Sequence, residues 1–354
     1  MSEKIMILKM LDEGKITADE AERLIKATEK NPDENISTPF KEEFLKIQDK
    51  AKDLFNVFVN EFGEVMKDFP GTIFEKQEKF VFHKDVNSVH DKKGDSIYVE
   101  GINDNFEFLK TDEDKIKIEG KIYVDDNFIE GKDIEPDFNV EKKENGLLLS
   151  LTRDMDYKAK FSGKIYVPEN IKIECKNSSG AILCSEIKGE CNLTNENGAI
   201  TAKNNEGNLI IHNKNGKIKI NDLKGNLDID TTNGSILVSD IKGNSNVHAL
   251  NGSIKLIKPD GNIDLSTKNG SIKLLLKDAL KDFENKLITK NGSIRVLMSG
   301  DIKTNILAKT KLGRVKISEE LEAEFENNEY KINGGGPVLK LETQMGSISA
   351  NLIK

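Results

Sequence analysis

Glycine recurs in this chain with a fixed period, and that period constrains the fold more than any other feature. Two series of glycines each advance in steps of 18 residues, and the second series is offset from the first by nine. The members are Gly180, Gly198, Gly216, Gly234, Gly252 and Gly270 in the first series, and Gly189, Gly207, Gly225, Gly243 and Gly261 in the second. A fixed period of this length is typical of repeat proteins, in which each unit packs on its neighbours.

The residues that follow each glycine alternate between apolar and polar. The second and fourth positions are mostly aliphatic, as in Ile236 and Val238 or in Leu227 and Ile229. Such alternation predicts a strand with one buried face. Two strands per 18-residue coil, with a turn at each end, predict a mainly β fold. That fold is a single-chain β-solenoid whose parallel coils stack about 4.8 Å apart.

The solenoid is predicted to fill residues 166–354. Beyond Gly270 the first series continues less regularly through Gly292, Gly313 and Gly346, which predicts nine coils stacked in that order. Residues 73–165 contain irregular strand-like runs. We expect them to cap or begin the solenoid, because a bare end would leave unpaired strand edges.

The first 72 residues have a helical pattern instead. Residues 1–30 predict a helical hairpin with a stop at Gly14. Residues 31–72 predict a linker with two prolines and then a long amphipathic helix, from about residue 41 to 68. We expect the apolar stripe of this helix to pack on the rest of the chain. Self-association and a membrane interface are the alternatives.

These patterns resemble a known bacterial family. The runs GKIYVPENIKIECKNSSGAI and INGGGPVLKLETQMGSI, with the NGSI ladder between them, are similar to the putative-adhesin β-solenoid family of unknown function. The hairpin resembles a small SHOCT-like module, which makes the architecture similar to the YvlB and LiaX type. The resemblance implies a role in the cell-envelope stress response of Gram-positive bacteria. It implies no catalytic residues.

Charge and hydropathy limit the partners and the compartment. The formal net charge of −8 argues against specific nucleic-acid binding. The sequence contains neither a signal-peptide core nor a run of about 18 apolar residues. We therefore expect a cytoplasmic protein, or one held peripherally at a membrane by a partner. Cell-surface display is the remaining alternative.

The cysteines and histidines do not predict a metal or redox site. Cys175, Cys184 and Cys191 lack metal-ligand spacing, so we expect small buried residues. His212 and His248 lie two coils apart, about 9.6 Å at the coil spacing, which is too far to share a zinc ion easily. We predict no cofactor.

Three aspartates on the same predicted face were weighed as candidates for chemistry. Asp228 and Asp264 are two coils apart, with Asn246 between them, so they do not form a compact carboxylate pair. Asp228 and Asp230 offer at most a weak cation site, and a solvated polar face is the favoured interpretation. We expect no enzymatic activity.

The most distinctive predicted surface is a basic column three positions after the first-series glycines. Stacking would align Lys255, Lys273, Arg295 and Lys316 at the cost of like-charge repulsion. This column is interpreted either as a device for solubility or as a docking stripe for an anionic membrane or cell-wall polymer. The candidate binding residues are Lys219, Lys255, Lys273, Arg295 and Lys316.

The repeated NGSI motif is interpreted as a corner of the coil, not as a binding motif. Glycine permits the backbone angles of a corner, and asparagine tolerates them better than most residues. Asparagines in register are expected to stack as a ladder of amides. The predicted ladder contains Asn197, Asn215, Asn233, Asn251, Asn269 and Asn291.

The predicted function is that of a non-enzymatic cell-envelope stress or interaction protein. The solenoid would be a rigid binding surface, and residues 1–69 would bind a membrane or regulatory partner or form a homo-oligomer. Two alternatives stay open. One is a polysaccharide-binding or, with less support, polysaccharide-cleaving β-helix protein, and the other is a purely structural oligomeric scaffold.

Overall fold

The structure is a computed structural model that describes residues 82–353, apart from positions 93, 126–135, 153–157 and 283. The chain separates into two compact units, residues 1–70 with 354 and residues 71–353, and all described residues belong to the second. The hairpin predicted over residues 1–30 and the helix predicted within residues 31–72 lie outside the described residues.

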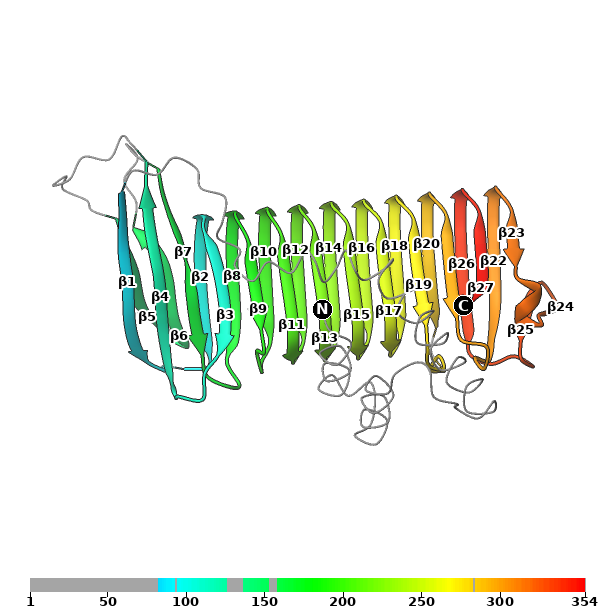
Figure 1. The fold of residues 1–354 in the computed structure, drawn as a ribbon, viewed down its shortest axis with the longest axis horizontal. Coiled ribbons are helices and arrows are strands. Elements are labelled where there is room, and N and C mark those ends of the chain that lie inside the picture. Colours follow the sequence, from blue (N-terminus) through cyan, green and yellow to red (C-terminus); the bar gives the residue numbers. More distant parts are fainter. Residues whose placement is uncertain (1–81, 93, 126–135, 153–157, 283, 354) are drawn as a thin grey trace, which may run out of the picture. The chain divides into compact units, whose positions relative to one another are not determined.

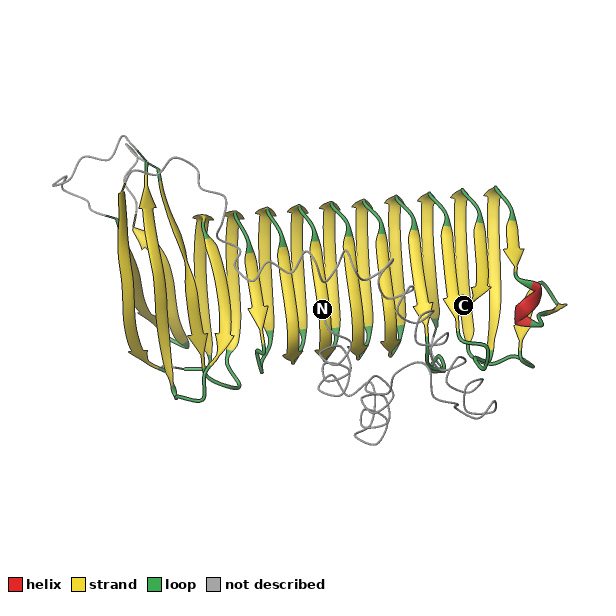
Figure 2. Cartoon of the chain, in the orientation of Figure 1, coloured by secondary structure: helices red, strands yellow, loops and turns green. Residues whose placement is uncertain are grey.

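Two sheets face each other across the interior of the second unit (Figures 1 and 2). Among the described residues, sheet A has 13 strands and sheet B has 14. In the middle of the stack each coil contributes one strand to each sheet, and successive coils pair in parallel, as predicted. These central strands are β8 (Lys172–Ser179), β10 (Cys191–Asn197), β12 (Leu209–Asn215), β14 (Leu227–Asn233), β16 (Ser245–Asn251), β18 (Ile263–Asn269) and β20 (Asn285–Asn291) in sheet B, and β9 (Ile182–Ser185), β11 (Ile200–Glu206), β13 (Ile218–Lys224), β15 (Ile236–Lys242), β17 (Ile254–Asp260), β19 (Ile272–Leu276) and β21 (Ile294–Met298) in sheet A.

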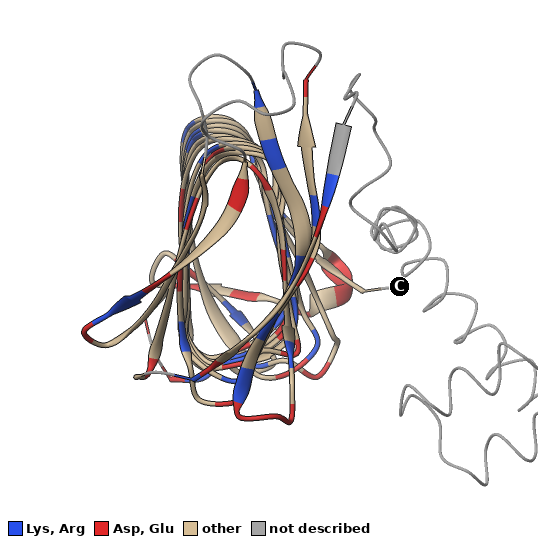
Figure 3. Ribbon diagram, turned by 90° about the vertical axis from the view of Figure 1, so that its left-hand side faces the viewer, with Lys and Arg blue, Asp and Glu red and all other residues tan. Residues whose placement is uncertain are grey.

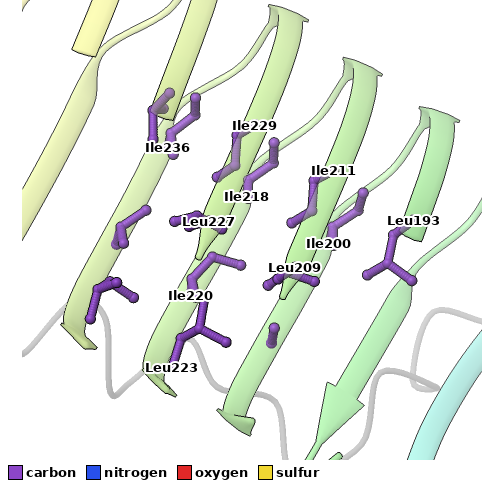
Figure 4. Close-up of a cluster of buried hydrophobic side chains, with 14 of the residues drawn as sticks. Leu193, Ile200, Leu209, Ile211, Ile218, Ile220, Leu223, Leu227, Ile229 and Ile236 are labelled. Carbon is purple, nitrogen blue, oxygen red and sulfur yellow. The ribbon is translucent and has the colours of Figure 1, made fainter. Parts of the chain in front are cut away.

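The interior is a narrow column of aliphatic side chains, because the inward positions of the coils are apolar and in register. Ile211 pairs with Ile229, and Ile229 with Val247, on neighbouring strands of sheet B. All three are fully buried. Figure 4 shows leucine and isoleucine side chains of successive coils stacked on one another. Each such side chain contributes about 1.5–3 kcal/mol when fully buried, so a coil is stable only when neighbours cover it.

Several sheet A strands bend at a position that simple alternation does not predict. Asn204, Asp222, Asp240 and Lys258 have left-handed backbone, with φ between 48° and 56°. The strand pairing skips these residues, which is the pattern of a β-bulge. Asparagine and aspartate enter this region more readily than most residues. After the bend a further side chain, such as Leu223, points inward and is buried.

One corner of the stack brings the backbones of successive first-series glycines close together. The N–H of Gly234 donates to the carbonyl of Asn251 at 3.0 Å. A Cβ placed on Gly234, where φ is +146°, would lie 1.9 Å from the carbonyl oxygen of Gly216. Only glycine fits this contact, so the period of 18 records the distance along the chain between equivalent corners.

The amino-terminal end is built out of sequence order. The coil of β2 and β3 lies between the coil of β6 and β7 and the coil of β8 and β9. Strands β1, β4 and β5 pair antiparallel outside them and close this end. The strands are β1 (Phe82–Asp91), β2 (Ser96–Asn103), β3 (Asn105–Lys110), β4 (Lys115–Val124), β5 (Asp137–Lys143), β6 (Gly146–Thr152) and β7 (Ala159–Val167).

A buried aspartate fixes this inserted coil to its neighbours. Asp104 lies between β2 and β3 and is fully buried. Its Oδ1 accepts a hydrogen bond from the backbone N–H of Phe161 at 2.6 Å, and its Oδ2 accepts one from the N–H of Ile102 at 3.1 Å. Its backbone carbonyl accepts from Nδ2 of Asn177 at 2.7 Å. Because Phe161 is in β7 and Asn177 is in β8, Asp104 contacts the coils on both sides.

The carboxyl-terminal end corrects the predicted coil order. The coil that begins at Gly346 lies between those of Gly292 and Gly313, since β26 pairs with both β20 and β22 and β27 pairs with both β21 and β23. The regular last segment thereby gains a neighbour on each side, while an irregular hairpin covers the edge of β22. These elements are β22 (Thr304–Leu312), β23 (Val315–Ile317), a short 3-10 helix (Glu319–Leu321), β24 (Glu324–Glu326), β25 (Glu329–Ile332), β26 (Val338–Met345) and β27 (Ile348–Leu352).

The three cysteines are free and buried, as predicted. Cys175, Cys184 and Cys191 are at most 2 % exposed. Burial raises the pKa of the Cys175 thiol. A hydrogen bond with Cys191, followed by burial, raises the pKa of Cys184. The thiolate is the reactive form, so these cysteines are protected both by burial and by protonation.

We predict that iodoacetamide at pH 8.5 leaves the folded protein unlabelled and modifies three thiols after unfolding in denaturant. Unfolding restores a thiol pKa of about 8.5. The unfolded state therefore releases protons above that pH while the native thiols stay protonated, so the free energy of unfolding should fall as the pH rises further. Mass spectrometry checks the labelling, and rapid labelling of the native state would contradict the buried assignment.

Candidate binding surfaces

The predicted basic column lies on the outer face of sheet A, but it is not continuous. Lys255, Lys273 and Arg295 occupy neighbouring strands in register. Ser349 of β27 then lies between Arg295 and Lys316. The predicted alignment of Lys316 beside Arg295 is therefore wrong, because the last segment of the chain inserts between their two coils.

Exposure also varies along this column. Lys219 is only 7 % exposed, and Leu237 separates it from Lys255. Burial, and then the positive charge of Arg295, lowers the pKa of Lys273. Arg295 and Lys316 are exposed. The column is therefore a less uniform cationic surface than the sequence predicts.

The six asparagines of the predicted corner ladder lie in one column, and each donates to the preceding one. The Nδ2 of Asn233 donates to Oδ1 of Asn215 at 2.8 Å, and the Nδ2 of Asn251 donates to Oδ1 of Asn233 at 2.9 Å. The same bond joins the other neighbouring pairs at 2.7 to 2.8 Å. The Nδ2 of Asn197 donates to the carbonyl of Ser178 at 3.3 Å. These amides support the corner, so NGSI marks structure and not a ligand site.

A second asparagine ladder at the opposite corner was not predicted. Oδ1 of Asn208 accepts from the backbone N–H of Asn226 at 3.1 Å, and the same contact at 3.0 Å links Asn226 to Asn244 and Asn244 to Asn262. The sequence signal is asparagine directly after the second-series glycines. Both corners are therefore held by side-chain amides repeated once per coil.

The histidines and aspartates on the outer face of sheet B form separate contacts. Nδ1 of His212 lies 3.8 Å from Oδ2 of Asp230, while Nδ1 of His248 lies 2.6 Å from Oγ of Ser266. Asp228 accepts from Asn246 at 3.1 Å, and Asp264 pairs with Lys286 at 2.9 Å. Within the described ranges, no group of three or more acidic, histidine or cysteine side chains could hold a metal ion.

A groove runs along the same face of sheet B, beside the corner that carries the first asparagine ladder. Its first part, about 610 Å³, is lined by residues of β10, β12, β14 and β16. Its second part, about 450 Å³, continues over β18, β20, β26 and β22, and Ala249 lines both parts. The floor is made of small buried side chains. Asn213, Thr267 and Thr289 each donate to a corner glycine carbonyl, at 3.3, 3.0 and 2.8 Å.

Comparison with known proteins assigns the chain to a family. The model of the family described as Toastrack DUF4097 matches residues 88–349, which is most of the chain. This protein belongs to the Toastrack DUF4097 family. The model of a SHOCT-like domain matches residues 2–33 of the same Toastrack protein. No curated protein matches it.

Solved structures similar to this Toastrack protein include three bacterial proteins. One, titled a putative cell adhesion protein from Clostridium sporogenes, is 13% identical, and the match covers 76% of this chain and 100% of that one, with a TM-score of 0.18. A putative adhesin from Bacteroides fragilis is 16% identical over 77% and 98%, with a TM-score of 0.24. A putative adhesin from Parabacteroides merdae is 13% identical over 77% and 97%, with a TM-score of 0.21.

The second part of the Toastrack groove is basic, and the sequence pattern was not used to predict this. Lys268 and Lys290 precede ladder asparagines, Lys311 precedes Leu312 at the equivalent corner, and Lys309 lies two residues before Lys311. The signal was a lysine directly before the corner residue. Among the described residues, no helix is both long and apolar enough to span a membrane.

Proposed function

We propose that this Toastrack protein is a non-enzymatic binding protein of the cell-envelope stress response. The observation that carries the proposal is the unbroken parallel register from β8 to β20 and from β9 to β21. Side chains at equivalent positions repeat once per coil on a hydrogen-bonded framework. Such a surface suits an extended ligand or a partner that makes the same contact several times.

The SHOCT-like match at residues 2–33 supports a second role for the amino-terminal unit. A module of this size has little hydrophobic core of its own and gains stability by docking. We propose that residues 1–69 bind a membrane-embedded or regulatory partner on the cytoplasmic side of the membrane. The solenoid would then present its grooved face to the ligand.

Cell fractionation followed by affinity capture of the full chain tests this function. We expect a membrane or regulatory partner to be recovered with the full chain, more strongly after treatment with an envelope-active antibiotic, and to be lost when residues 1–69 are removed. Equal recovery with and without both the antibiotic and residues 1–69 would contradict the proposal.

A purely structural scaffold is the alternative that the same deletion separates. If the protein acts only by oligomerising through residues 1–69, its molar mass in solution should fall by a whole-number factor on their removal, with no partner recovered. A monomeric full chain that captures a partner would favour the binding role. The groove on sheet B favours an extended polymer as the ligand, and lack of turnover of anionic glycans would separate binding from cleavage.

A further inference from the structure

The carboxyl-terminal part of the groove collects four lysines on neighbouring strands. Lys268 of β18 and Lys290 of β20 occupy equivalent positions on adjacent strands. β26 follows in the sheet, and β22 then supplies Lys309 and Lys311. The four strands lie side by side at this end of the stack (Figure 1). All four lysine side chains are exposed.

These lysines differ from other lysines of the solenoid because carboxylates do not neutralise them. Elsewhere the stack pairs charges from coil to coil, as in Lys224 with Glu206 at 2.6 Å and Lys258 with Asp240 at 3.0 Å. None of the four groove lysines makes an ion pair with another described residue. The carboxylate of Glu342 at this end of the groove pairs with Lys340 at 3.2 Å.

Charged residues lie all around the coils when the stack is viewed along its axis (Figure 3). The distinguishing feature of the groove is therefore the sign of its charge over four adjacent strands. Like charges on neighbouring strands destabilise their pairing. The repulsion is relieved when an anion binds between them, so the arrangement has a cost in the free protein that a polyanion would remove.

The shape of the site favours a chain over a flat surface. The lysines border a concave groove that crosses the strands, so its direction is that of the coil stack. The floor hydroxyls of Thr267, Thr289 and Thr343 already donate to glycine carbonyls, at 3.0, 2.8 and 2.9 Å. Recognition in this part of the groove therefore falls to the lysine ammonium groups, which bind anions as point charges.

We propose that the groove over β18, β20, β26 and β22 binds a linear phosphodiester polymer through Lys268, Lys290, Lys309 and Lys311. This inference deepens the proposed binding function and rests on it. A flexible polymer with one negative charge per unit can follow ammonium groups that recur along the coil stack. Several weak contacts on one chain add to a measurable affinity, whereas a single phosphate makes only one of them.

The test uses the full chain and a poly(glycerol phosphate) chain as the probe. The variant Lys268→Glu, Lys290→Glu, Lys311→Glu should bind at least about tenfold more weakly, since each tenfold corresponds to about 1.4 kcal/mol. The matched control, Lys142→Glu, Lys242→Glu, Lys316→Glu, changes the net charge equally at exposed sites away from the groove and should bind within about twofold of the unmodified chain. Binding should weaken steeply with added salt. Circular dichroism establishes that both variants are folded.

Three outcomes would overturn the assignment. Equal loss in both variants would mean that net charge alone controls binding. Equal affinity for polyglutamate would exclude a phosphate polymer as the specific ligand class. Tighter binding to vesicles of anionic phospholipid than to the polymer, lost in the groove variant, would assign the site to a membrane surface. Partner capture that depends on residues 1–69 would still support the proposed function in each case, so the two failures are distinguishable.

Discussion

Replacing Gly234 by alanine is expected to destabilise the solenoid by at least about 3 kcal/mol, which is a large effect for one methyl group. The added Cβ would lie 1.9 Å from the carbonyl oxygen of Gly216, and the φ of +146° is one that residues with a side chain rarely adopt. The contact is between backbones, so no side chain can move to relieve it. The coils would have to separate at this corner, breaking the bond from Gly234 N–H to Asn251 and the amide contact of Asn233 with Asn251.

Chemical denaturation followed by circular dichroism measures this loss, with Gly300→Ala as the matched control. At Gly300 the nearest atom to an added Cβ is the terminal Cδ1 of Leu352 at 3.2 Å, which is the flexible end of a side chain. We expect the control to change the free energy of unfolding by less than about 1 kcal/mol. If both variants unfold at the same denaturant concentration, the close packing of the glycine corner is not what requires glycine.

Replacing Asp104 by alanine is expected to cost about 3 kcal/mol or more, and to act first at the amino-terminal end. The change leaves the buried N–H of Phe161 without its acceptor at 2.6 Å and removes the acceptor of the Ile102 N–H. Hydrogen bonds to a charged group are worth about 1.5–3 kcal/mol each, and a buried donor left unsatisfied costs further free energy. The loss should appear as faster amide hydrogen exchange in β2, β3 and β7, with β12 to β18 still protected.

Two companion variants sharpen this test. Asp104→Asn keeps the shape and one acceptor oxygen, so its cost should fall between that of alanine and zero. Asp85→Asn, at a side chain that is 77% exposed, should change the free energy of unfolding by less than about 0.5 kcal/mol. Uniform acceleration of exchange through the whole stack would argue against a local role for Asp104.

The regular part of the fold could be predicted from sequence because every coil repeats the same local solution. Alternation after Gly234 and Gly225 sets which residues point inward, and stacking of identical coils leaves little freedom in the register. The asparagine corner follows from the same logic. The bulge at Asp222 and its neighbours was missed because one left-handed residue shifts the inward pattern by one position without changing the period.

The ends could not be predicted in the same way, and the candidate site shows the consequence. Periodicity orders coils by position along the chain, whereas burial of Leu339, Leu341 and Ile348 favours a place with neighbours on both sides. The insertion of β26 and β27 puts Ser349 beside Arg295 and brings Lys311 and Lys290 to either side of β26. A basic column on one face was therefore overestimated, and a basic groove on the other was overlooked.

The insertion of β26 and β27 has a further consequence for how the protein is made. A ribosome delivers β20 to β23 before the segment that must lie between their coils, so this end cannot reach its final arrangement during synthesis of those strands. The place must stay open, or be reopened, until almost the last residue has been added. A chain that stops short of Val338 would present two mismatched coil edges, so the fold reports whether the message was translated to its end.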